Sequence, residues 1–262
     1  MDIQNLTSIE KFMAGLPIDI PSEEDGVDKL CTIYSVTLRQ IAEVGAKNFY
    51  SYLNIFTLNK EDVDEYFAQQ EIEGEKPNLT PFQFLLVMTQ VDPQYLKTVL
   101  EAFKLFLHEE TITFLRTNEA IVLGDIGEKR IIDNDKFEII KQIIEQANTL
   151  DTQGADARMD NPSDAKAAQI IKKLKEGRKM REKAKGSDLS FSDLVASLAA
   201  GANGLNILNV WDLPYYAFND QFKRMQMKEE YENTYKSLLA GADPKKVKIR
   251  YWIDTIQDKE IK

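Results

Sequence analysis

The sequence changes character abruptly after residue 150, and this break constrains the fold more than any other feature. Residues 151–163 (DTQGADARMDNPS) contain no aromatic side chain and are rich in Gly, Asp, Asn, Ala and Pro, a composition typical of a linker. A basic run follows at once. We therefore expect an N-terminal domain over residues 1–150, a linker with a basic helix over residues 151–188, and a C-terminal helical domain over residues 189–262.

The basic run, residues 164–185, has a net charge of +6, because it contains nine Lys or Arg and three Asp or Glu. The whole chain of 262 residues has a formal charge of −10, so the remainder carries −16. A basic segment in an acidic chain can bind its own acidic body, a partner protein or an anion in solution, or it can be a solvated helix. The side chains expected to make such contacts are Lys172, Lys173, Lys175, Arg178, Lys179 and Arg181.

Nucleic acid is an alternative ligand for the stretch from Lys166 to Lys185. No aromatic side chains that could stack on bases are interleaved with its Lys and Arg residues, so only phosphate contacts would be available. The acidic balance of the whole chain also repels the nucleic-acid backbone and anionic membrane surfaces. We therefore favour a protein partner over nucleic acid and expect no membrane binding.

The scarcity of histidine and cysteine excludes several classes of site. The sequence has one histidine, His108, and one cysteine, Cys31, so a disulfide within the chain and a His-rich metal site are both impossible. His108 lies at the end of an apolar helical pattern, where we expect it to interact with the helix dipole rather than act as a base. Cys31 is expected to be a small buried residue of a short strand.

Motifs of catalysis are also missing from the sequence. It has no P-loop, dinucleotide-binding glycine pattern, nucleophile elbow or EF-hand loop. The acidic run at residues 61–65 could bind a divalent cation. Adjacent acids on a helix point to different faces, however, so we expect a solvated face. The sequence predicts a protein that is not an enzyme and has no cofactor.

No membrane span or leader is expected. The sequence lacks a run of about 18 apolar residues. Its first residues (MDIQNLTSIEKF) lack the basic start and apolar core of a signal peptide. We expect the protein to stay in the compartment where it is made.

The N-terminal domain is predicted to be α+β and predominantly α-helical. A short helix should begin with a capping box of Thr7 and Glu10 and end at Gly15. Residues 30–34 predict a strand. Residues 38–56 then predict one apolar helical face, made of Leu38, Ile41, Phe49, Tyr52, Leu53 and Phe56.

The second half of that domain carries clear start signals. Thr80 should cap a helix with Pro81 at its first position, and Asp92-Pro93 should start the next helix. Residues 111–133 alternate around glycine-containing turns, which predicts a small antiparallel β-meander. A helix should follow a cap at residues 133–135.

The C-terminal domain is predicted to contain a short helix and then a long one. Ser190 should cap a helix that ends at Gly201. The long helix, about residues 212–240, has apolar side chains in one sector up to Met225 and in the opposite sector from Met227 onward. It either bends there or packs on two neighbours, which belong to the same fold or to another protein. The candidates for partner contact are Trp211, Tyr215, Phe218, Phe222, Met225, Met227, Tyr231 and Tyr235.

Two stretches resemble proteins encoded in the tail-morphogenesis gene clusters of long-tailed phages and prophages of Gram-positive bacteria. One contains CTIY at residues 31–34, YSYL at residues 50–53 and TPFQFL at residues 80–85. The other contains SDLVASLA at residues 192–199 and NVWDLPYYAF at residues 209–218. A variable charged linker before such an ending is also typical of these proteins.

The resemblance implies a tail assembly chaperone or an associated tail protein. Such a protein would bind the helical tape-measure protein, keep it soluble and help tail-tube subunits polymerise around it. The resemblance therefore implies phage tail proteins as partners, namely the tape-measure protein and the tail-tube protein, and leaves self-association open. The expected location is the cytoplasm of the bacterial host, with incorporation into the virion as an alternative. The other function that we consider is a nucleic-acid-associated phage protein that uses the basic run.

Overall fold

The computed structural model describes residues 7–69, 77–115, 119–125, 127–148, 190–241 and 251–253. The predictions for the linker and the basic run, with Lys172, Lys173, Lys175, Arg178, Lys179 and Arg181, lie outside these residues.

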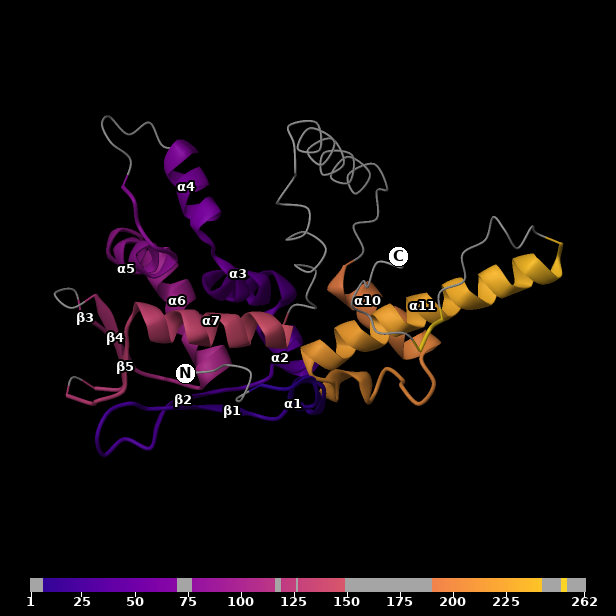
Figure 1. The fold of residues 1–262 in the computed structure, drawn as a ribbon, viewed down its shortest axis with the longest axis horizontal. Helices are drawn as coiled ribbons and strands as arrows, with labels where there is room; N and C mark the ends of the chain where they lie inside the picture. The colour runs from indigo at the N-terminus through magenta and orange to yellow at the C-terminus, as the bar shows by residue number, and fades with distance from the viewer. Residues whose placement is uncertain are drawn as a thin grey trace. The chain divides into compact units, whose positions relative to one another are not determined.

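The chain forms two compact units (Figure 1). Unit 1 contains Met1–Asn148 and Asp212–Ala217, and unit 2 contains Thr149–Trp211 and Phe218–Lys262. Helices predominate and the strands form small antiparallel sheets, which confirms the α+β, predominantly helical prediction.

Unit 1 opens with helix α1 (Ile9–Ala14) and the hairpin of β1 (Ile18–Pro21) and β2 (Lys29–Ile33). The predicted cap of α1 was wrong by one residue, because Ser8 accepts the hydrogen bond from the Lys11 N–H. Gly15 ends the helix as predicted, in the left-handed conformation at φ 67°. Strand β2 was predicted and β1 was not.

The next three helices are α2 (Leu38–Val44), α3 (Ala46–Thr57) and α4 (Lys60–Gln69). Gly45, at φ 84°, separates α2 from α3, so two helices share the apolar face predicted over residues 38–56. Four of its six side chains, at Leu38, Ile41, Phe49 and Phe56, have no exposed surface.

Helices α5 (Pro81–Val91) and α6 (Pro93–Leu107) begin where the sequence predicted. The side chains of Thr80 and Gln83 form a capping box. The side chain of Asp92 accepts hydrogen bonds from the N–H groups of Gln94 and Tyr95.

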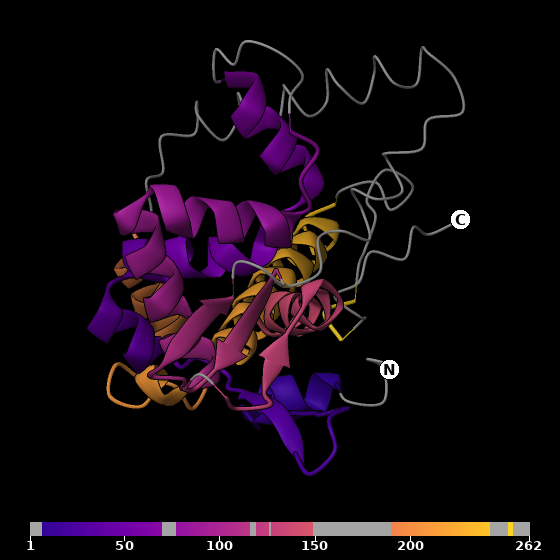
Figure 2. The same ribbon diagram turned by 90° about the vertical axis from the view of Figure 1, so that its left-hand side faces the viewer.

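The predicted β-meander is present as β3 (Ile112–Leu115), β4 (Ala120–Leu123) and β5 (Ile131–Ile132), in that spatial order. Figure 2 shows its strands side by side. Asp133 then accepts a hydrogen bond from the Lys136 N–H at the start of helix α7 (Asn134–Asn148), which confirms the predicted cap.

The core of unit 1 is a network of phenylalanine rings. The ring of Phe56 lies 5.5 Å from those of Phe103 and Phe106 and 5.9 Å from that of Phe137. Phe82 extends the network, with its centroid 5.0 Å from that of Phe137. All five rings are at most 1% exposed, so α3, α5, α6 and α7 meet at one aromatic centre.

Unit 2 contains helix α10 (Phe191–Gly201), most of the 3-10 turn η2 (Val210–Asp212) and most of helix α11 (Tyr215–Leu239). Ser190 and Asp193 form the predicted capping box of α10, which ends at Gly201 as predicted. Helix α11 starts at Tyr215, three residues after the predicted start, because Asp212 belongs to η2 and Pro214 forms a bridge with Thr37. The first residues of α11, Tyr215–Ala217, belong to unit 1.

Candidate partner-binding surfaces

The segment Asp212–Ala217 is held in unit 1 by main-chain pairing with the start of α2. The Leu38 N–H donates to the Leu213 carbonyl at 3.0 Å, and the Tyr215 N–H donates to the Val36 carbonyl at 2.8 Å. Thr37 and Pro214 form an antiparallel bridge between these two bonds. This C-terminal segment therefore completes unit 1.

Side chains add to this attachment. The Arg39 guanidinium donates to the Asp212 carboxylate at 2.7 Å. The Tyr215 ring packs edge-on against Phe49 at 5.1 Å, and its hydroxyl lies 3.3 Å from that of Tyr50. Tyr215, a predicted partner contact, is 9% exposed and lies within unit 1.

Gly15 allows Pro214 to approach unit 1 closely. A Cβ atom at Gly15 would lie 2.7 Å from Cγ of Pro214, inside van der Waals contact. The αL conformation of Gly15 also favours glycine. One glycine therefore both ends α1 and makes room for the segment Asp212–Ala217.

The first half of α11 forms the core of unit 2. Phe218 is 3% exposed, and its ring lies 6.2 Å from that of Phe191 and 6.1 Å from that of Phe222. A Cβ atom at Gly201 would lie 2.6 Å from Sδ of Met225, so α10 ends in close contact with α11. Phe222 and Met225 are half-buried, as is Trp211 in η2.

The second half of α11 leaves aromatic and aliphatic side chains at the surface. Tyr231 stacks on Tyr235 with ring centroids 6.4 Å apart, and Tyr251 packs edge-on against Tyr231 at 5.2 Å. Tyr235 is 51% exposed and Leu239 is 73% exposed. Met227, a predicted contact residue, is half-buried one turn before Tyr231.

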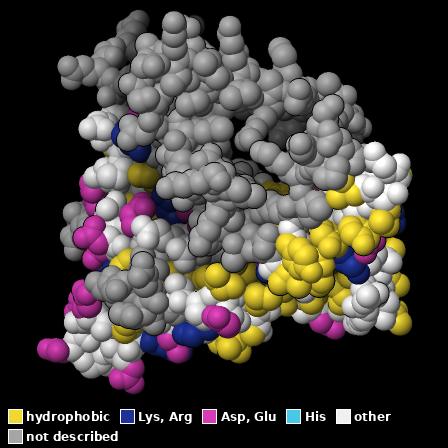
Figure 3. All heavy atoms as spheres, turned by 45° about the vertical axis from the view of Figure 1, so that its right-hand side comes forward, with side chains coloured by type: hydrophobic (Ala, Val, Ile, Leu, Met, Phe, Trp, Pro, Cys, Tyr) yellow, Lys and Arg dark blue, Asp and Glu magenta, His cyan; other side chains and the backbone are white. Residues whose placement is uncertain are grey.

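We call this surface the aromatic face of unit 2. Its residues are Tyr231, Tyr235, Leu239 and Tyr251. Trp252 and Ile253, which follow Tyr251 in the chain, are also exposed. In the view of Figure 3, hydrophobic side chains gather on the side of the molecule that carries α11. The opposite side of the helix is polar and exposed, with Gln226, Glu229, Asn233 and Ser237. This part of α11 is therefore amphipathic, and its apolar side is accessible to a partner.

His108 and Cys31 have structural roles. His108 ends α6 in the left-handed conformation at φ 55°, and its ring stacks on that of Tyr34 at 3.8 Å. This confirms its predicted position at a helix end. Cys31 is buried as predicted, and loss of solvation raises the pKa of its thiol to about 12.

The acidic run at residues 61–65 lies on α4. Val63 is fully buried, whereas the acids on both sides of it are exposed. Lys60 pairs with Asp64 at 2.6 Å, and Asp62 accepts a hydrogen bond from the Asn59 N–H. These contacts fit the predicted solvated face. Among the described residues, no cluster of three or more His, Cys, Asp or Glu could hold a metal ion.

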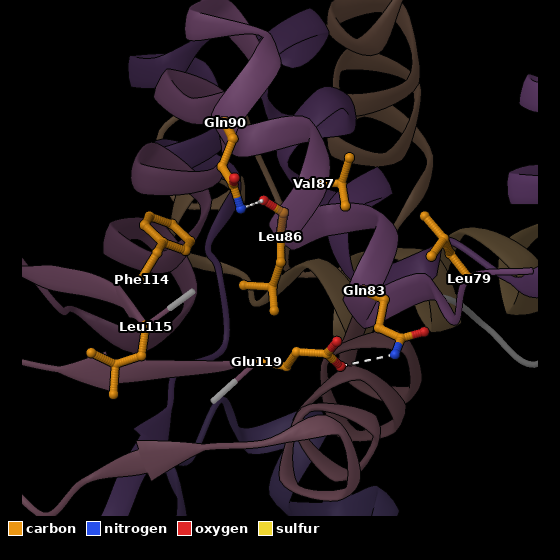
Figure 4. A pocket seen from close by; sticks show the side chains of 8 residues that line it. All are labelled: Leu79, Gln83, Leu86, Val87, Gln90, Phe114, Leu115 and Glu119. Carbon is orange, nitrogen blue, oxygen red and sulfur yellow. Dashed lines mark hydrogen bonds between the residues drawn. The ribbon is translucent and has the colours of Figure 1, made fainter. Parts of the chain in front are cut away.

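Unit 1 contains a pocket that sequence reasoning missed. It has a volume of about 150 Å³ and lies between α5 and the tip of the β3–β4 hairpin (Figure 4). Gln83 donates a hydrogen bond to Glu119 at 2.8 Å across one end, and Gln90 donates to the Leu86 carbonyl. One feature of the sequence hints at this pocket. Helix α5 (PFQFLLVMTQV) has apolar side chains on more sides of the helix than the core of unit 1 covers. The pocket is lined by Leu79, Gln83, Leu86, Val87, Gln90, Phe114, Leu115 and Glu119.

Residues 181–257 match the family model described as the YomV second domain. This family is phage-derived and comes from a Bacillus prophage. No curated protein and no solved structure matches the chain. Over the described residues, every helix is too short or too polar to cross a membrane.

The YomV second-domain match contains the elements that define unit 2 and its surface. It covers α10, η2, α11 and the whole aromatic face. It also covers Asp212–Ala217, the segment that completes unit 1. The matched residues therefore contain both the aromatic face and the segment that completes unit 1.

Proposed function

We propose that this protein is a non-enzymatic phage tail assembly protein, a chaperone that binds the tape-measure protein and aids tail-tube assembly. Two findings support the proposal: residues 181–257 match a phage-derived family, and two stretches resemble tail-morphogenesis proteins. The observation that carries it is the aromatic face of unit 2, which lies inside the matched residues.

The chemistry of this face suits a helical partner. A tape-measure helix has apolar stripes that must be covered before assembly, and a chaperone for it needs a complementary apolar surface. Tyrosine supplies a large ring for such contacts while its hydroxyl stays hydrated, so the free chaperone remains soluble. The polar side of α11 would stay in water when the aromatic face is covered.

The same proposal accounts for the other residues singled out. Stacking of His108 and burial of Cys31 suit a protein that acts by contact rather than by catalysis. The cytoplasm of a bacterial host is where tail proteins would meet such a chaperone, and the virion is a later location if it stays bound.

The test is capture of the tape-measure protein encoded in the same genome. The full chain would be tagged and co-expressed with it, and the co-purified amount would be measured. Tyr235→Glu with Leu239→Glu puts two charges on the aromatic face, and we expect at least about tenfold less capture. Both side chains are more than half exposed, so the fold should survive.

The matched control is Asn233→Glu with Ser237→Glu. It adds the same two charges at the same spacing on the polar side of the same helix. Capture should equal that of the unaltered chain. Equal capture by both double variants, with unchanged circular dichroism, would contradict the proposal. Phe218 is not a useful target, because its 3% exposure makes any loss of capture a folding effect.

A further inference from the structure

Within the described residues, the outer edge of β3 is an unprotected sheet edge. Proteins usually protect such edges with a charge, a proline or a bulge, because free main-chain groups can pair with another chain. Strand β1 has all three, with Asp19, Pro21 and a register shift between Ile20 and Pro21. Strand β3 reads Ile-Thr-Phe-Leu and pairs with β4 in unbroken register. It therefore lacks the devices that protect β1.

The hydrogen-bond pattern identifies the groups that face outward. The Gly124 N–H donates to the Thr111 carbonyl at 2.8 Å. Pairing alternates along an antiparallel ladder, so Thr113 and Leu115 direct their main-chain groups toward β4. The N–H and C=O groups of Ile112 and Phe114 consequently point to the outer edge. Within the described part of the chain, neither residue has a hydrogen-bond partner on that side.

The pocket between α5 and the hairpin lies beside this edge. Phe114 and Leu115 of β3 both line the pocket. Because side chains of successive strand residues point to opposite faces, the pocket must reach around the end of the strand. Its opposite wall includes Leu86 and Val87 of α5 (Figure 4). Val87 is 40% exposed. An extended chain on β3 could therefore place an apolar side chain in the pocket.

Charge indicates which kind of chain would bind there. Among the described residues of unit 1, acidic side chains outnumber basic ones by 23 to 11. Glu119 is the charged residue of the pocket, and it has no cationic partner among the described residues. A ligand with Lys or Arg next to its apolar side chains would be attracted by unit 1 and would complement Glu119.

We propose that the outer edge of β3 and the adjoining pocket bind an extended segment of a partner protein in which apolar residues alternate with Lys or Arg. The segment adds a strand to the sheet through the main-chain groups of Ile112 and Phe114. One apolar side chain enters the pocket. The adjacent Lys or Arg points to the other face of the added strand and contributes through the acidic charge of unit 1, which includes Glu119. This site is in unit 1 and is independent of the function proposed for the aromatic face.

The experiment measures fluorescence anisotropy of a labelled eight-residue peptide of alternating Lys and Val, titrated with the full chain. We expect saturable binding below about 1 mM, and at least about tenfold weaker binding of a peptide of alternating Glu and Val. Equal binding of the two peptides, or no saturable binding of the Lys and Val peptide, would overturn the proposal.

Two variants of α5 separate the pocket from long-range charge. Val87→Lys places a cation in the pocket wall, and we expect at least about tenfold weaker binding. Val91→Lys makes the same change one turn later, at a residue that is 67% exposed and does not line the pocket. It should weaken binding by no more than about threefold. Similar losses in both variants would overturn the proposal.

A third variant tests the main-chain pairing. Ile112→Pro removes an outward N–H at the first residue of β3, where proline is tolerated because the ladder to β4 is untouched. Binding should be lost while the thermal unfolding midpoint stays close to that of the unaltered chain. Sedimentation of the full chain without peptide tests another occupant. A dimer that Ile112→Pro abolishes would assign the edge to a second copy and would overturn the proposed partner strand.

Discussion

The two units use their aromatic side chains in opposite ways. Unit 1 joins Phe56, Phe103, Phe106 and Phe137 into a centre from which water is excluded. Unit 2 packs the first half of α11 in the same manner but leaves the aromatic face of its second half at the surface. Helical periodicity shows which side of a helix is apolar, but it does not show what covers that side. The same kind of residue therefore serves stability in unit 1 and is left exposed in unit 2, where we propose that it serves recognition.

The largest expected effect compares a buried ring with an exposed one. Phe106→Ala removes a fully buried side chain that packs against Phe56, so it should cost about 3–5 kcal/mol of unfolding free energy. Tyr235→Ala, at a half-exposed ring of unit 2, should change that free energy by no more than about 0.5 kcal/mol. Urea denaturation of the full chain measures both. A loss above 2 kcal/mol for Tyr235→Ala would show that the aromatic face is part of a core.

A second prediction concerns the glycine that admits Pro214 to unit 1. Gly15→Ala forces a Cβ atom into a left-handed residue, which costs about 1–2 kcal/mol, and also into contact with Pro214. Gly26 is a matched control, because its φ is 82° and nothing lies within 4 Å of a Cβ there. Gly26→Ala should show the conformational cost alone. Gly15→Ala should lower the free energy of unfolding by about 1–3 kcal/mol more than Gly26→Ala does.

Urea midpoints of the two glycine variants, compared at equal m-values, give this difference. Equal destabilisation would mean that the segment Asp212–Ala217 moves aside at little cost. In that case the attachment of this C-terminal segment would contribute little to the stability of unit 1.

Capping signals made most helix starts predictable from sequence. The boxes at Thr80 and Ser190 and the cap at Asp92 involve contacts within three residues, so local sequence determines them. The start of α1 was predicted one residue early, because Thr7 and Ser8 are both good caps and the choice depends on local geometry. Strand β1 was missed because Ile18 and Ile20 form a strand only by pairing with β2, ten or more residues later.

The surfaces were less predictable than the elements. Of the residues grouped on α11, Tyr215 completes unit 1, Phe218 lies in the core of unit 2, and Tyr235 is exposed. A helical wheel places Tyr215 and Phe218 in one sector and Tyr235 in the opposite one, but it contains no information on which distant neighbours cover either sector. The pocket beside β3 depends on contacts between residues 36 positions apart, such as Gln83 and Glu119, and no local pattern indicates such a pair.

A third, smaller effect compares helix caps in the two units. Thr80→Ala removes the capping hydrogen bond of α5 and the bond from the Thr80 hydroxyl to Asn134, so it should cost about 1–2 kcal/mol. Ser190→Ala removes an exposed cap of α10 and should cost about 0.5–1 kcal/mol. Amide hydrogen exchange should locate each loss in its own helix. Loss of protection in α5 after Ser190→Ala would contradict the separation of the effects.

The smallest expected effect concerns the ion pair between Arg39 and Asp212. Its hydrogen bonds to Asp212 raise the pKa of Arg39 above the usual value, but both side chains are more than half exposed. At low salt, Arg39→Gln should therefore lower the urea midpoint less than Thr80→Ala does. In about 1 M NaCl, where charges are screened within about 3 Å, Arg39→Gln should no longer lower the midpoint.

Lys60→Gln is the control for this salt dependence. It breaks a slightly less exposed pair with Asp64 inside one helix, whereas Arg39 and Asp212 are 173 positions apart. Of these two ion pairs, only that of Arg39 involves the segment Asp212–Ala217, so only Arg39→Gln should make the segment more sensitive to proteolysis at low salt. A shift for Arg39→Gln that persists in 1 M NaCl would mean that the guanidinium acts by packing over the segment rather than by its charge.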